Sequence, residues 1–578
     1  MPRHRLAPLL TSVCGHRWVP WIAPVLAMVL CLPALGVGFR IDDWMHQAML
    51  HGVEPSPRQG SVFLEYFTFV DGDPERHRVL TELGVLPWWS WPQLQVRFLR
   101  PLSAASHVLD HALLPGSSVF AHLHSLLWLG ALVAMAGACY RRFLGASWVA
   151  GLAALLYAVD EAHGIPVGWI ANRNALITGT LGLAALLLHD RARRRGGVPL
   201  LAPLVLGAAL LAGEAAVATM AWLVAYGLVV DTGSWRARLG SLAPAATVLV
   251  AWRAAYRWLG YGTAGSGVYI DPATSPGDFL TQLPARVVLL LADQLWSVPS
   301  TAADFLAPSS RTLVVAVALP LVLLVVVQGA RRLHASPLAW FWGLGTVLSV
   351  LPVASTTPGA RLLTFVGFGG AALVALFIEQ AFQGSGRPVL ATTLLIVHGP
   401  LAAAQLPVQA WSIRGISATL VDPCAHTLPD DPGLPDKTVV FVNSNDLCAG
   451  DLAYQLAVRQ RPRPAAVRLL SSALYDIEVR RLDAHTLQID VPAGLQSTQA
   501  DRLHRVDVAM PVGHEVAMNG MTVRVTSWNE EERVDQFHVR FDADLDDPSW
   551  IWMGTVDLRS VPHELPPEGE VLRLPAAF

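Results

Sequence analysis

Two adjacent carboxylates, Asp42 and Asp43, stand in the stretch GFRIDDWMHQ, directly after a strongly apolar N-terminal segment. Just outside a membrane, one carboxylate could act as general base on an acceptor hydroxyl while its neighbour orients the acceptor or binds a divalent cation. The alternative is that the pair caps the helix that follows, because acidic side chains favour a helix N-terminus. We place Asp43 slightly ahead as the base, only because it lies deeper in the predicted helix.

Arginines form a second group of candidates. Arg97 and Arg100 stand in VRFLRPLS, ahead of another apolar run, and Arg361 begins a further run in TTPGARLL. An arginine near a membrane surface can hold a lipid phosphate through paired, charge-assisted hydrogen bonds. Ordinary snorkelling toward lipid headgroups is the alternative for each of them.

Two further polar stretches interrupt apolar sequence. The segment VDEAHGIPVGWIANRN carries His163, Trp169 and Arg173, and Glu214 stands alone in LLAGEAAV. Ionisable groups at or near membrane depth are costly, so these residues are functional candidates. An ordinary polar turn is the alternative for the first stretch, and Glu214 requires either a turn or an inward-facing cavity.

The composition is that of a membrane protein. Of the 578 residues, 53% are hydrophobic and only 15% are charged. With a mean hydropathy of +0.43, the chain is too apolar for an ordinary soluble globule. The formal net charge of −3 gives no indication of a nucleic-acid partner. We therefore predict a polytopic α-helical membrane protein.

About eleven apolar runs approach the twenty residues that a helix needs to cross a bilayer. They lie at 19–38, 118–139, 146–160, 174–190, 198–213, 215–231, 239–259, 311–329, 337–354, 361–381 and 388–406. A shorter apolar stretch at 284–298 contains Asp293 and is predicted to be an interfacial or re-entrant helix. We interpret the first run as a retained helix rather than a cleaved signal peptide, because many further runs follow.

Clusters of basic residues indicate the orientation. They lie before the first run and after the second, fourth, sixth and eighth, so every second loop is basic. Because short cytoplasmic loops carry excess Lys and Arg, we predict a cytoplasmic N-terminus and an extracytoplasmic C-terminus. The long loops 39–117 and 260–310 then lie on the outer face, together with the acids and arginines described above.

The composition changes again near Ser412. A polar, Pro- and Asp-rich linker is predicted over 412–436, after a membrane domain of residues 1–411. Over 437–578, apolar and polar residues alternate as in half-buried strands, which predicts a mostly β extracytoplasmic domain with one helix in DLCAGDLAYQLAVRQ. Cys424 and Cys448 lie in this polar part, where they could form a disulfide or remain two unrelated buried thiols.

The order of these pieces resembles the GT-C superfamily of membrane glycosyltransferases, especially the polyprenyl-phosphate-sugar-dependent O-mannosyltransferases and their bacterial relatives with tetratricopeptide repeats. The matching pieces are the acid pair after the first run, RPLS, the pattern HxxxVxWIxxR, the turn Gly213–Glu214, and RLLTFVGFG from Arg361. The resemblance covers roughly residues 20–400. The chain departs from it at Asp160 and Glu161, where the family has His-Pro, and in its lack of repeats.

The resemblance implies an inverting glycosyltransferase that uses a polyprenyl-phosphate sugar on the outer face of a bacterial inner membrane. It makes Asp42 or Asp43 the catalytic base. The substrate-binding candidates are Arg97, Arg100, His163, Trp169, Arg173, Glu214 and Arg361. Expected partners are the lipid-linked sugar donor, membrane lipid and a glycan or protein acceptor, with no nucleic acid and no cofactor beyond a divalent cation at the acid pair. A non-catalytic envelope-assembly or scaffold protein with the same membrane fold is the alternative.

Overall fold

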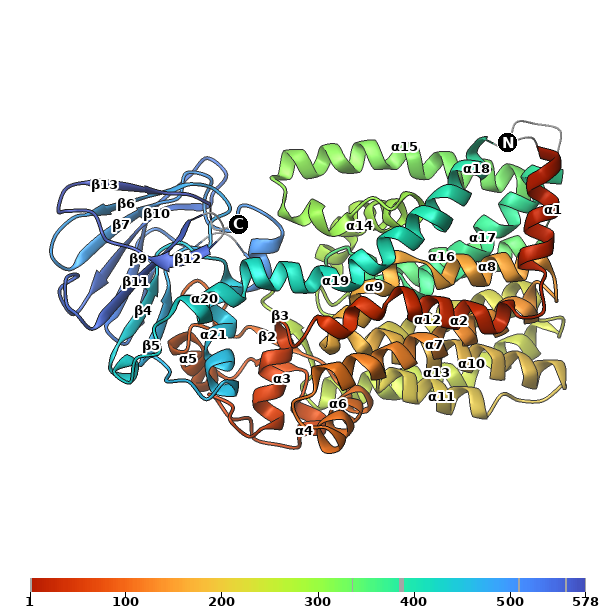
Figure 1. Cartoon of the computed structure of the whole chain (residues 1–578), viewed down its shortest axis with the longest axis horizontal. Coiled ribbons are helices and arrows are strands. Elements are labelled where there is room, and N and C mark those ends of the chain that lie inside the picture. The colour runs from red at the N-terminus through yellow and green to blue at the C-terminus, as the bar shows by residue number, and fades with distance from the viewer. Residues whose placement is uncertain (1–2, 335, 384–388, 508–509, 557–558, 577–578) are drawn as a thin grey trace.

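The computed structural model describes residues 3–334, 336–383, 389–507, 510–556 and 559–576. The molecule is elongated, with a bundle of helices at one end and a sheet-rich C-terminal domain at the other (Figure 1). The N-terminus lies at the far end of the bundle, and the C-terminus lies between the two parts. Residue 388, the first of the last predicted run, lies outside the described ranges.

The apolar runs fold into helices that pack side by side along the bundle (Figure 1). Their bounds are α1 Arg3–Cys14, α2 Val19–Leu30, α7 Ser118–Phe143, α8 Trp148–Ala158, α10 Asn174–Arg194, α11 Leu201–Leu210, α12 Val217–Ala225, α13 Trp235–Trp258, α15 Pro308–Leu333, α16 Pro337–Val353, α17 Thr364–Gln383, α18 Val389–Ile396 and α19 Ala402–Leu420. Short helical turns join them at η1 Leu32–Gly36, η2 Glu161–His163, α9 Gly164–Gly168, η3 Ile170–Arg173, η4 Glu214–Ala216, η5 Tyr226–Val230, η6 Ser300–Phe305, η7 Ala360–Leu362 and η8 Val397–Leu401.

Among the described residues, five helical stretches are long and apolar enough to cross a membrane. They are Val19–Gly36, Ser118–Phe143, Pro308–Leu333, Thr364–Gln383 and Val389–Leu420. Each of the eleven predicted runs contains a helix, but the number of crossings stays a prediction. On α15, Leu313 and Val317 are 65% and 56% exposed, and an exposed apolar face of this kind is suited to lipid.

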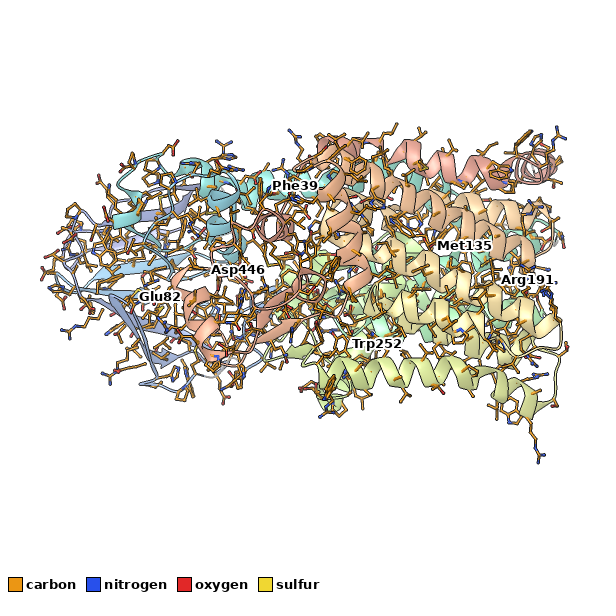
Figure 2. The ribbon with its side chains drawn as sticks, turned by 90° about the horizontal axis from the view of Figure 1, so that it is seen from below. Phe39, Glu82, Met135, Arg191, Trp252 and Asp446 are labelled. Carbon is orange, nitrogen blue, oxygen red and sulfur yellow. A yellow bond between two sulfur atoms is a disulfide. The ribbon has the colours of Figure 1, made fainter. Side chains whose placement is uncertain are left out.

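The two ends of the bundle differ in character. Phe39 lies at the end that faces the sheet-rich domain, Met135 lies midway and Arg191 lies at the far end (Figure 2). The basic stretch 191–195 at the end of α10 is thus separated from the two long loops by the length of the bundle. The predicted orientation, which assigns basic loops and candidate site residues to opposite faces, stays a prediction.

The two long loops fold at the end of the bundle nearest the sheet-rich domain. They contain α3 Asp42–Leu50, α4 Val62–Glu65, β1 Thr68–Asp71, α5 Pro74–Glu82, β2 Gln95–Arg97, α6 Pro101–Leu113, β3 Gly262–Ala264 and α14 Pro276–Trp296. The stretch predicted as an interfacial helix over 284–298 thus belongs to a longer helix that begins at Pro276. Strand β2 pairs antiparallel with both β1 and β3, so the two loops share one small sheet.

The C-terminal domain contains two sheets, as the alternation of apolar and polar residues predicts. Its elements are β4 Thr438–Phe441, α21 Asp446–Val458, β5 Ala466–Leu469, β6 Ile477–Arg481, β7 Thr486–Asp490, η10 Ala500–Leu503, β8 Glu515–Met518, β9 Met521–Trp528, β10 Val534–Phe541, β11 Trp550–Val556, β12 Arg559–Pro562 and β13 Val571–Leu574. The strand orders are β13-β6-β7-β10-β9-β8 and β12-β11-β4-β5. Phe537 of β10 pairs with Ile489 of β7 and Val525 of β9, and all three side chains are buried in the core.

The segment predicted as a linker over 412–436 differs from an extended linker. Helix α19 continues to Leu420, and α20 Asp422–Thr427 follows at once, before η9 Leu434–Asp436. The reason is the placement of proline: residues 412–420 contain none, and Pro423 occupies the first turn of α20. At that position the missing backbone N–H costs no helical hydrogen bond.

The first long loop, 39–117, packs against the C-terminal domain. Trp88 and Trp89 are 4% and 2% exposed and belong to the hydrophobic core of that domain. The Trp88 indole Nε1 donates a hydrogen bond to the Leu470 carbonyl at 2.9 Å. At the end of α5, Glu82 forms an ion pair with Arg468 of β5. The sheet-rich domain is therefore held against the bundle by a loop of the membrane domain.

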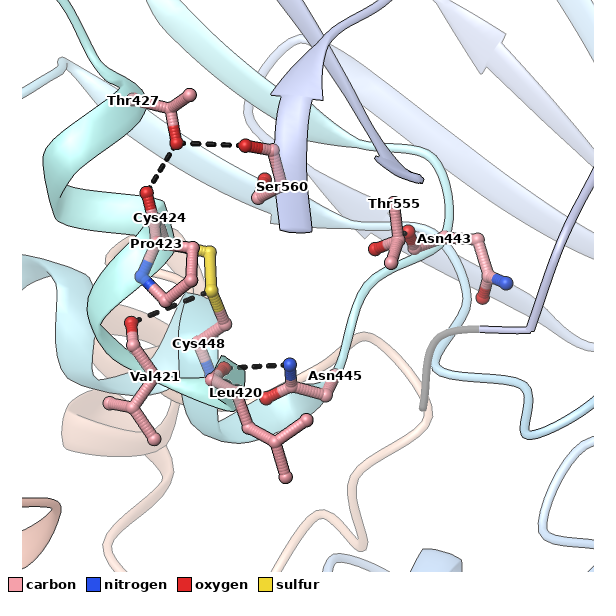
Figure 3. Close-up of a disulfide and its surroundings, with 10 residues drawn as sticks. All are labelled: Leu420, Val421, Pro423, Cys424, Thr427, Asn443, Asn445, Cys448, Thr555 and Ser560. Carbon is pink, nitrogen blue, oxygen red and sulfur yellow. Dashed lines mark hydrogen bonds between the residues drawn. A yellow bond between two sulfur atoms is a disulfide. The ribbon is translucent and has the colours of Figure 1, made fainter. Parts of the chain in front are cut away.

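A disulfide joins Cys424 of α20 to Cys448 of α21 (Figure 3). Of the two alternatives that the sequence left open, the structure has the bonded one. The bond connects α20, which directly follows the last bundle helix α19, to α21 of the C-terminal domain, which packs against α3. Nearby, the Asn445 side chain donates to the Leu420 carbonyl at 2.7 Å and caps α21 through the Cys448 amide.

Replacing both cysteines, as Cys424→Ser with Cys448→Ser, should lower the free energy of unfolding by about 3 kcal/mol, because the bond closes a loop with a sequence separation of 24 residues. The denaturant midpoint of the full chain, followed by tryptophan fluorescence, measures the change. Cys14→Ala is the control, since Cys14 is a free buried thiol in the bundle. Equal midpoints for the oxidised and reduced wild-type protein would contradict the expected contribution.

Candidate active site

A cavity of about 550 Å³ lies where the bundle meets the two long loops. It is lined by α3, the small three-stranded sheet, η3, η4, α13 and η7, and Trp252 on its wall is labelled in Figure 2. The charged residues that line it are Asp42, Arg100, Glu214, Arg253, Asp271 and Arg361. Five of the predicted site residues thus meet in one place, namely Asp42, Arg100, Trp169, Glu214 and Arg361.

Two of the three arginines on the wall are neutralised by carboxylates. Arg100 Nε donates to Glu214 Oε2 at 2.7 Å, and Arg253 pairs with Asp271. The Arg100 guanidinium also lies 4.3 Å from the centre of the Phe98 ring, a cation–π contact. Glu214 therefore has the inward-facing position that its isolation in an apolar run required, and its partner comes from a distant loop.

Arg361 differs from these two arginines. It lies on η7 at the cavity wall, and within the described chain its guanidinium has neither an ion-pair partner nor a hydrogen-bond acceptor. A guanidinium that no carboxylate pairs with is suited to bind an anion such as a phosphate.

Asp42 is the first residue of α3 and lines this cavity. Burial raises the pKa of its carboxyl to about 6, while the positive charges of Arg361 and then Arg100 act to lower it. The residue before it, Ile41, has a φ of 50°. A left-handed conformation costs a residue of this type about 1–3 kcal/mol and tends to occur at functional sites. Asp42 is thus a carboxylate whose proton exchanges near neutral pH.

Asp43 has a different environment, although it is the next residue. Its side chain is 2% exposed. One oxygen accepts from the Ala171 amide at 2.8 Å and the other accepts from the Arg40 amide at 2.9 Å. Burial raises the pKa of this carboxyl to about 8, against the lowering effect of the two amides. Asp43 does not line the cavity; it ties α3 to η3, which carries the opposite wall.

The structure places Arg97 and His163 away from the cavity wall. Arg97 forms an ion pair with Glu65 at 2.5 Å and lies 4.3 Å from the centre of the Tyr261 ring. His163 is 1% exposed, and its Nε2 lies 2.8 Å from the Tyr157 carbonyl oxygen. The Arg97 guanidinium and His163 Nε2 thus have partners within the protein, whereas His163 Nδ1 is buried without one among the described residues. The spacing of residues in the sequence could not indicate these contacts.

Arg173 is also used within the protein. It is fully buried, pairs with Asp110 at 2.6 Å, and donates to the Ser125 hydroxyl at 3.0 Å and to the Ala121 carbonyl at 2.7 Å. These partners come from α6 and α7, so Arg173 joins η3 to two helices. In this structure it does not reach the cavity that Arg361 lines.

Two charged residues of the cavity wall, Arg253 and Asp271, are not among the predicted site residues. Arg253 lies in α13, inside a predicted apolar run, and Asp271 follows β3 in the second long loop, 260–310. The signal was present: an arginine within a membrane-length apolar run requires a partner or a cavity. Its partner is 18 residues away in the chain and belongs to another element, so the sequence did not identify it.

The acid pair lacks the surroundings of a metal site. Among the residues that the structure describes, no group of three or more His, Cys, Asp or Glu side chains could hold a metal ion. Both oxygens of Asp43 accept from backbone amides. The geometry therefore does not support the divalent cation that the sequence led us to consider at Asp42 and Asp43.

No protein-family model matches the chain, and no curated protein matches it. Solved structures of ArnT from Cupriavidus metallidurans are among its structural neighbours. The structure bound to undecaprenyl phosphate has 14% sequence identity and a TM-score of 0.37, covering 78% of this chain and 89% of that chain. The apo structure has 14% identity and a TM-score of 0.36, covering 77% and 88%. A likeness at this level assigns no role to individual residues of this chain.

Replacement of Asp43 should destabilise the protein, whereas replacement of Asp42 should not. Asp43→Asn places an NH2 group against one of the two backbone amides that donate to Asp43. It should lower the free energy of unfolding by about 1–3 kcal/mol, because that buried N–H donor loses its acceptor. Asp42→Asn should not lower it, since burial already disfavours the Asp42 charge. Thermal midpoints of the full chain in detergent compare the two variants. Equal midpoints would contradict the structural role of Asp43.

Proposed function

We propose that the chain is an integral membrane glycosyltransferase of the GT-C kind, which transfers a sugar from a polyprenyl-phosphate donor to an acceptor hydroxyl with inversion. One observation carries the proposal: a carboxylate that titrates near neutral pH, Asp42, and a guanidinium without an ion-pair partner in the described chain, Arg361, line the same cavity. These are the two groups that the reaction needs, a base for the incoming hydroxyl and a cation for the leaving phosphate.

The reaction follows from their placement. Asp42 takes the proton of the acceptor hydroxyl while the oxygen of that hydroxyl bonds to the anomeric carbon of the donor sugar. The bond between that carbon and the phosphate oxygen breaks on the opposite side, and the electron pair leaves with the polyprenyl phosphate. Arg361 stabilises the charge that develops on this phosphate through charge-assisted hydrogen bonds. Direct displacement at one carbon inverts its configuration.

The walls of the cavity support a lipid-linked donor. Leu249 and Val250 of α13 and Val353 at the end of α16 line it, and Val250 is 68% exposed on the outside of the bundle. An apolar, outward-facing edge lets a polyprenyl chain remain in the hydrocarbon while its phosphate enters. This access from the lipid side favours an enzyme over a scaffold, which has no need of a cavity that joins lipid to a buried carboxylate.

The other candidate residues then have supporting roles. Glu214 holds Arg100 at the wall, and the Tyr256 hydroxyl lies 3.4 Å from the second Glu214 oxygen. Trp169 forms part of the wall beside them. In this proposal Arg97, His163 and Arg173 keep the surrounding elements in place and do not contact substrate. The proposed location is the inner membrane of a bacterium, with the N-terminus in the cytoplasm and the site on the outer face.

Asp42→Asn should reduce kcat by about 10²–10⁴-fold, the usual contribution of a general base. The measurement is transfer of labelled sugar in proteoliposomes from a panel of polyprenyl-phosphate sugars to membrane extracts or purified glycans. Asp43→Asn is the matched control: after correction for the folded fraction it should lose much less. Wild-type kcat in Asp42→Asn would end the assignment of the base.

The dependence of activity on pH gives a second test. A base must be ionised, so kcat/KM should fall as the pH drops through about 6, the raised pKa of Asp42. Arg361→Gln should raise the KM for the donor. It should also move the acid limb of the pH profile, the fall of kcat/KM at low pH, to higher pH, because Arg361 favours the ionised form of Asp42. Arg97→Gln, outside the cavity, should leave the limb in place. An unchanged or lower limb in Arg361→Gln would contradict the pairing of these two groups.

A further inference from the structure

A second cavity, of about 170 Å³, lies between the outer loops and the C-terminal domain. Asp42, Phe69 and Tyr269 line both this cavity and the larger one. From the C-terminal domain, α21 contributes Asp446, Leu447, Gly450, Asp451 and Tyr454, and His504 lies nearby on the same wall. Asp42 therefore stands at the boundary between two spaces, one reached from the bundle and one formed with the sheet-rich domain.

The two cavities differ in charge. The second is lined by the carboxylates of Asp42, Asp446 and Asp451, and its described lining includes no Lys or Arg. The lining does include a histidine, His504, and its Nε2 lies 3.0 Å from Asp446 Oδ2. The larger cavity, by contrast, has three arginines on its wall. An anion is thus favoured on the bundle side of Asp42 and disfavoured on the other side.

Two polar groups in the second cavity lack partners within the protein. Tyr454 is 2% exposed, and its hydroxyl has no hydrogen-bond partner among the described residues. One carboxylate oxygen of Asp451, Oδ2, is buried and also has no hydrogen-bond partner among the described residues. Burial, and after it the negative charges of Asp42 and Asp43, raises the pKa of Asp451 well above its usual range. The protonated form is therefore favoured, and a cationic group bound beside Asp451 would favour the ionised form instead. Buried polar groups are normally satisfied, so these two point to a ligand that supplies hydroxyl or amine groups.

We infer that the second cavity is the acceptor subsite and that it binds a non-anionic saccharide unit, preferring an amine-bearing sugar to its neutral counterpart. Carboxylates accept hydrogen bonds from hydroxyl and ammonium groups and repel phosphates and carboxylates. The aromatic rings of Phe69 and Tyr269 offer an apolar wall for the sugar ring. This inference rests on the proposed function, since Asp42 would receive the proton of a hydroxyl presented from this side.

The inference also assigns a role to the C-terminal domain. Helix α21 supplies most of the polar wall, and it is held by the Cys424–Cys448 bond and by the docking of Trp88 and Trp89. The domain then completes the site and selects the acceptor by charge. The long apolar groove between α15 and α17 has no comparable set of unsatisfied polar groups in its described lining.

The test measures binding of three trisaccharides to the full chain in phosphatidylcholine nanodiscs at low salt. The probes are the fully de-N-acetylated chitin trimer, the N-acetylated trimer and trigalacturonate. The expected order of affinity is amine-bearing, then neutral, then anionic.

Tyr454→Phe should weaken binding of the neutral probe about threefold to tenfold, as expected for one hydrogen bond. Asp446→Asn with Asp451→Asn should remove the preference for the amine. Asp476→Asn, an exposed acid of the same domain outside the cavity, should change neither.

Two results would overturn the inference. One is binding of trigalacturonate as tight as that of the amine-bearing probe, and the other is no binding of any probe by a wild-type protein of normal thermal midpoint. Undecaprenyl phosphate, added in a separate titration, tests the proposed function independently. If Arg361→Gln weakens that lipid while the saccharides do not bind, the donor site stands and the acceptor subsite falls. If Arg361→Gln has no effect on the lipid, the proposed function fails instead.

Discussion

The arrangement of this protein depends on the burial of two tryptophans from a loop of one domain in the core of the other. Trp88 and Trp89 leave water almost completely, and burial of side chains this large contributes more than any exposed polar contact at the junction. The approach is close: a Cβ at Gly84, where φ is 74°, would come within 2.5 Å of the Val467 side chain. Together with the Cys424–Cys448 bond, this docking holds α21 beside α3, where the second cavity lies.

Within that frame, two neighbouring aspartates serve different purposes because their surroundings differ. Asp43 accepts from two backbone amides that lie far apart in the chain, at Arg40 and Ala171. It thereby fixes the start of α3 and leaves Asp42 on the boundary between two cavities. One cavity carries arginines and an edge exposed to lipid, and the other carries carboxylates and an unsatisfied tyrosine hydroxyl. The proposed transfer uses this division, with the anionic leaving group on one side and the acceptor on the other.

Much of the fold could be predicted from the sequence, because it depends on local patterns. Apolar runs of membrane length became helices, and alternating segments such as 521–528 and 534–541 became paired strands. The helix over 446–458 was likewise recognisable. Within the predicted linker 412–436, helix α19 continues to Leu420, since the change in composition at Ser412 does not by itself end a helix. The number of crossings stays a prediction, because helix length and hydropathy alone do not establish it.

The candidate site was predictable only as a set of residue types. The sequence by itself determined that acids and arginines would gather at one end of an apolar bundle, since polar groups in apolar runs are costly and need partners or a cavity. Which of them would face that cavity was decided by tertiary structure. Arg173 forms an ion pair with Asp110, and Arg97 forms one with Glu65. Arg361 has no such partner in the described chain. Hydrogen bonds and ion pairs between segments distant in sequence made that choice, and no local spacing encodes them.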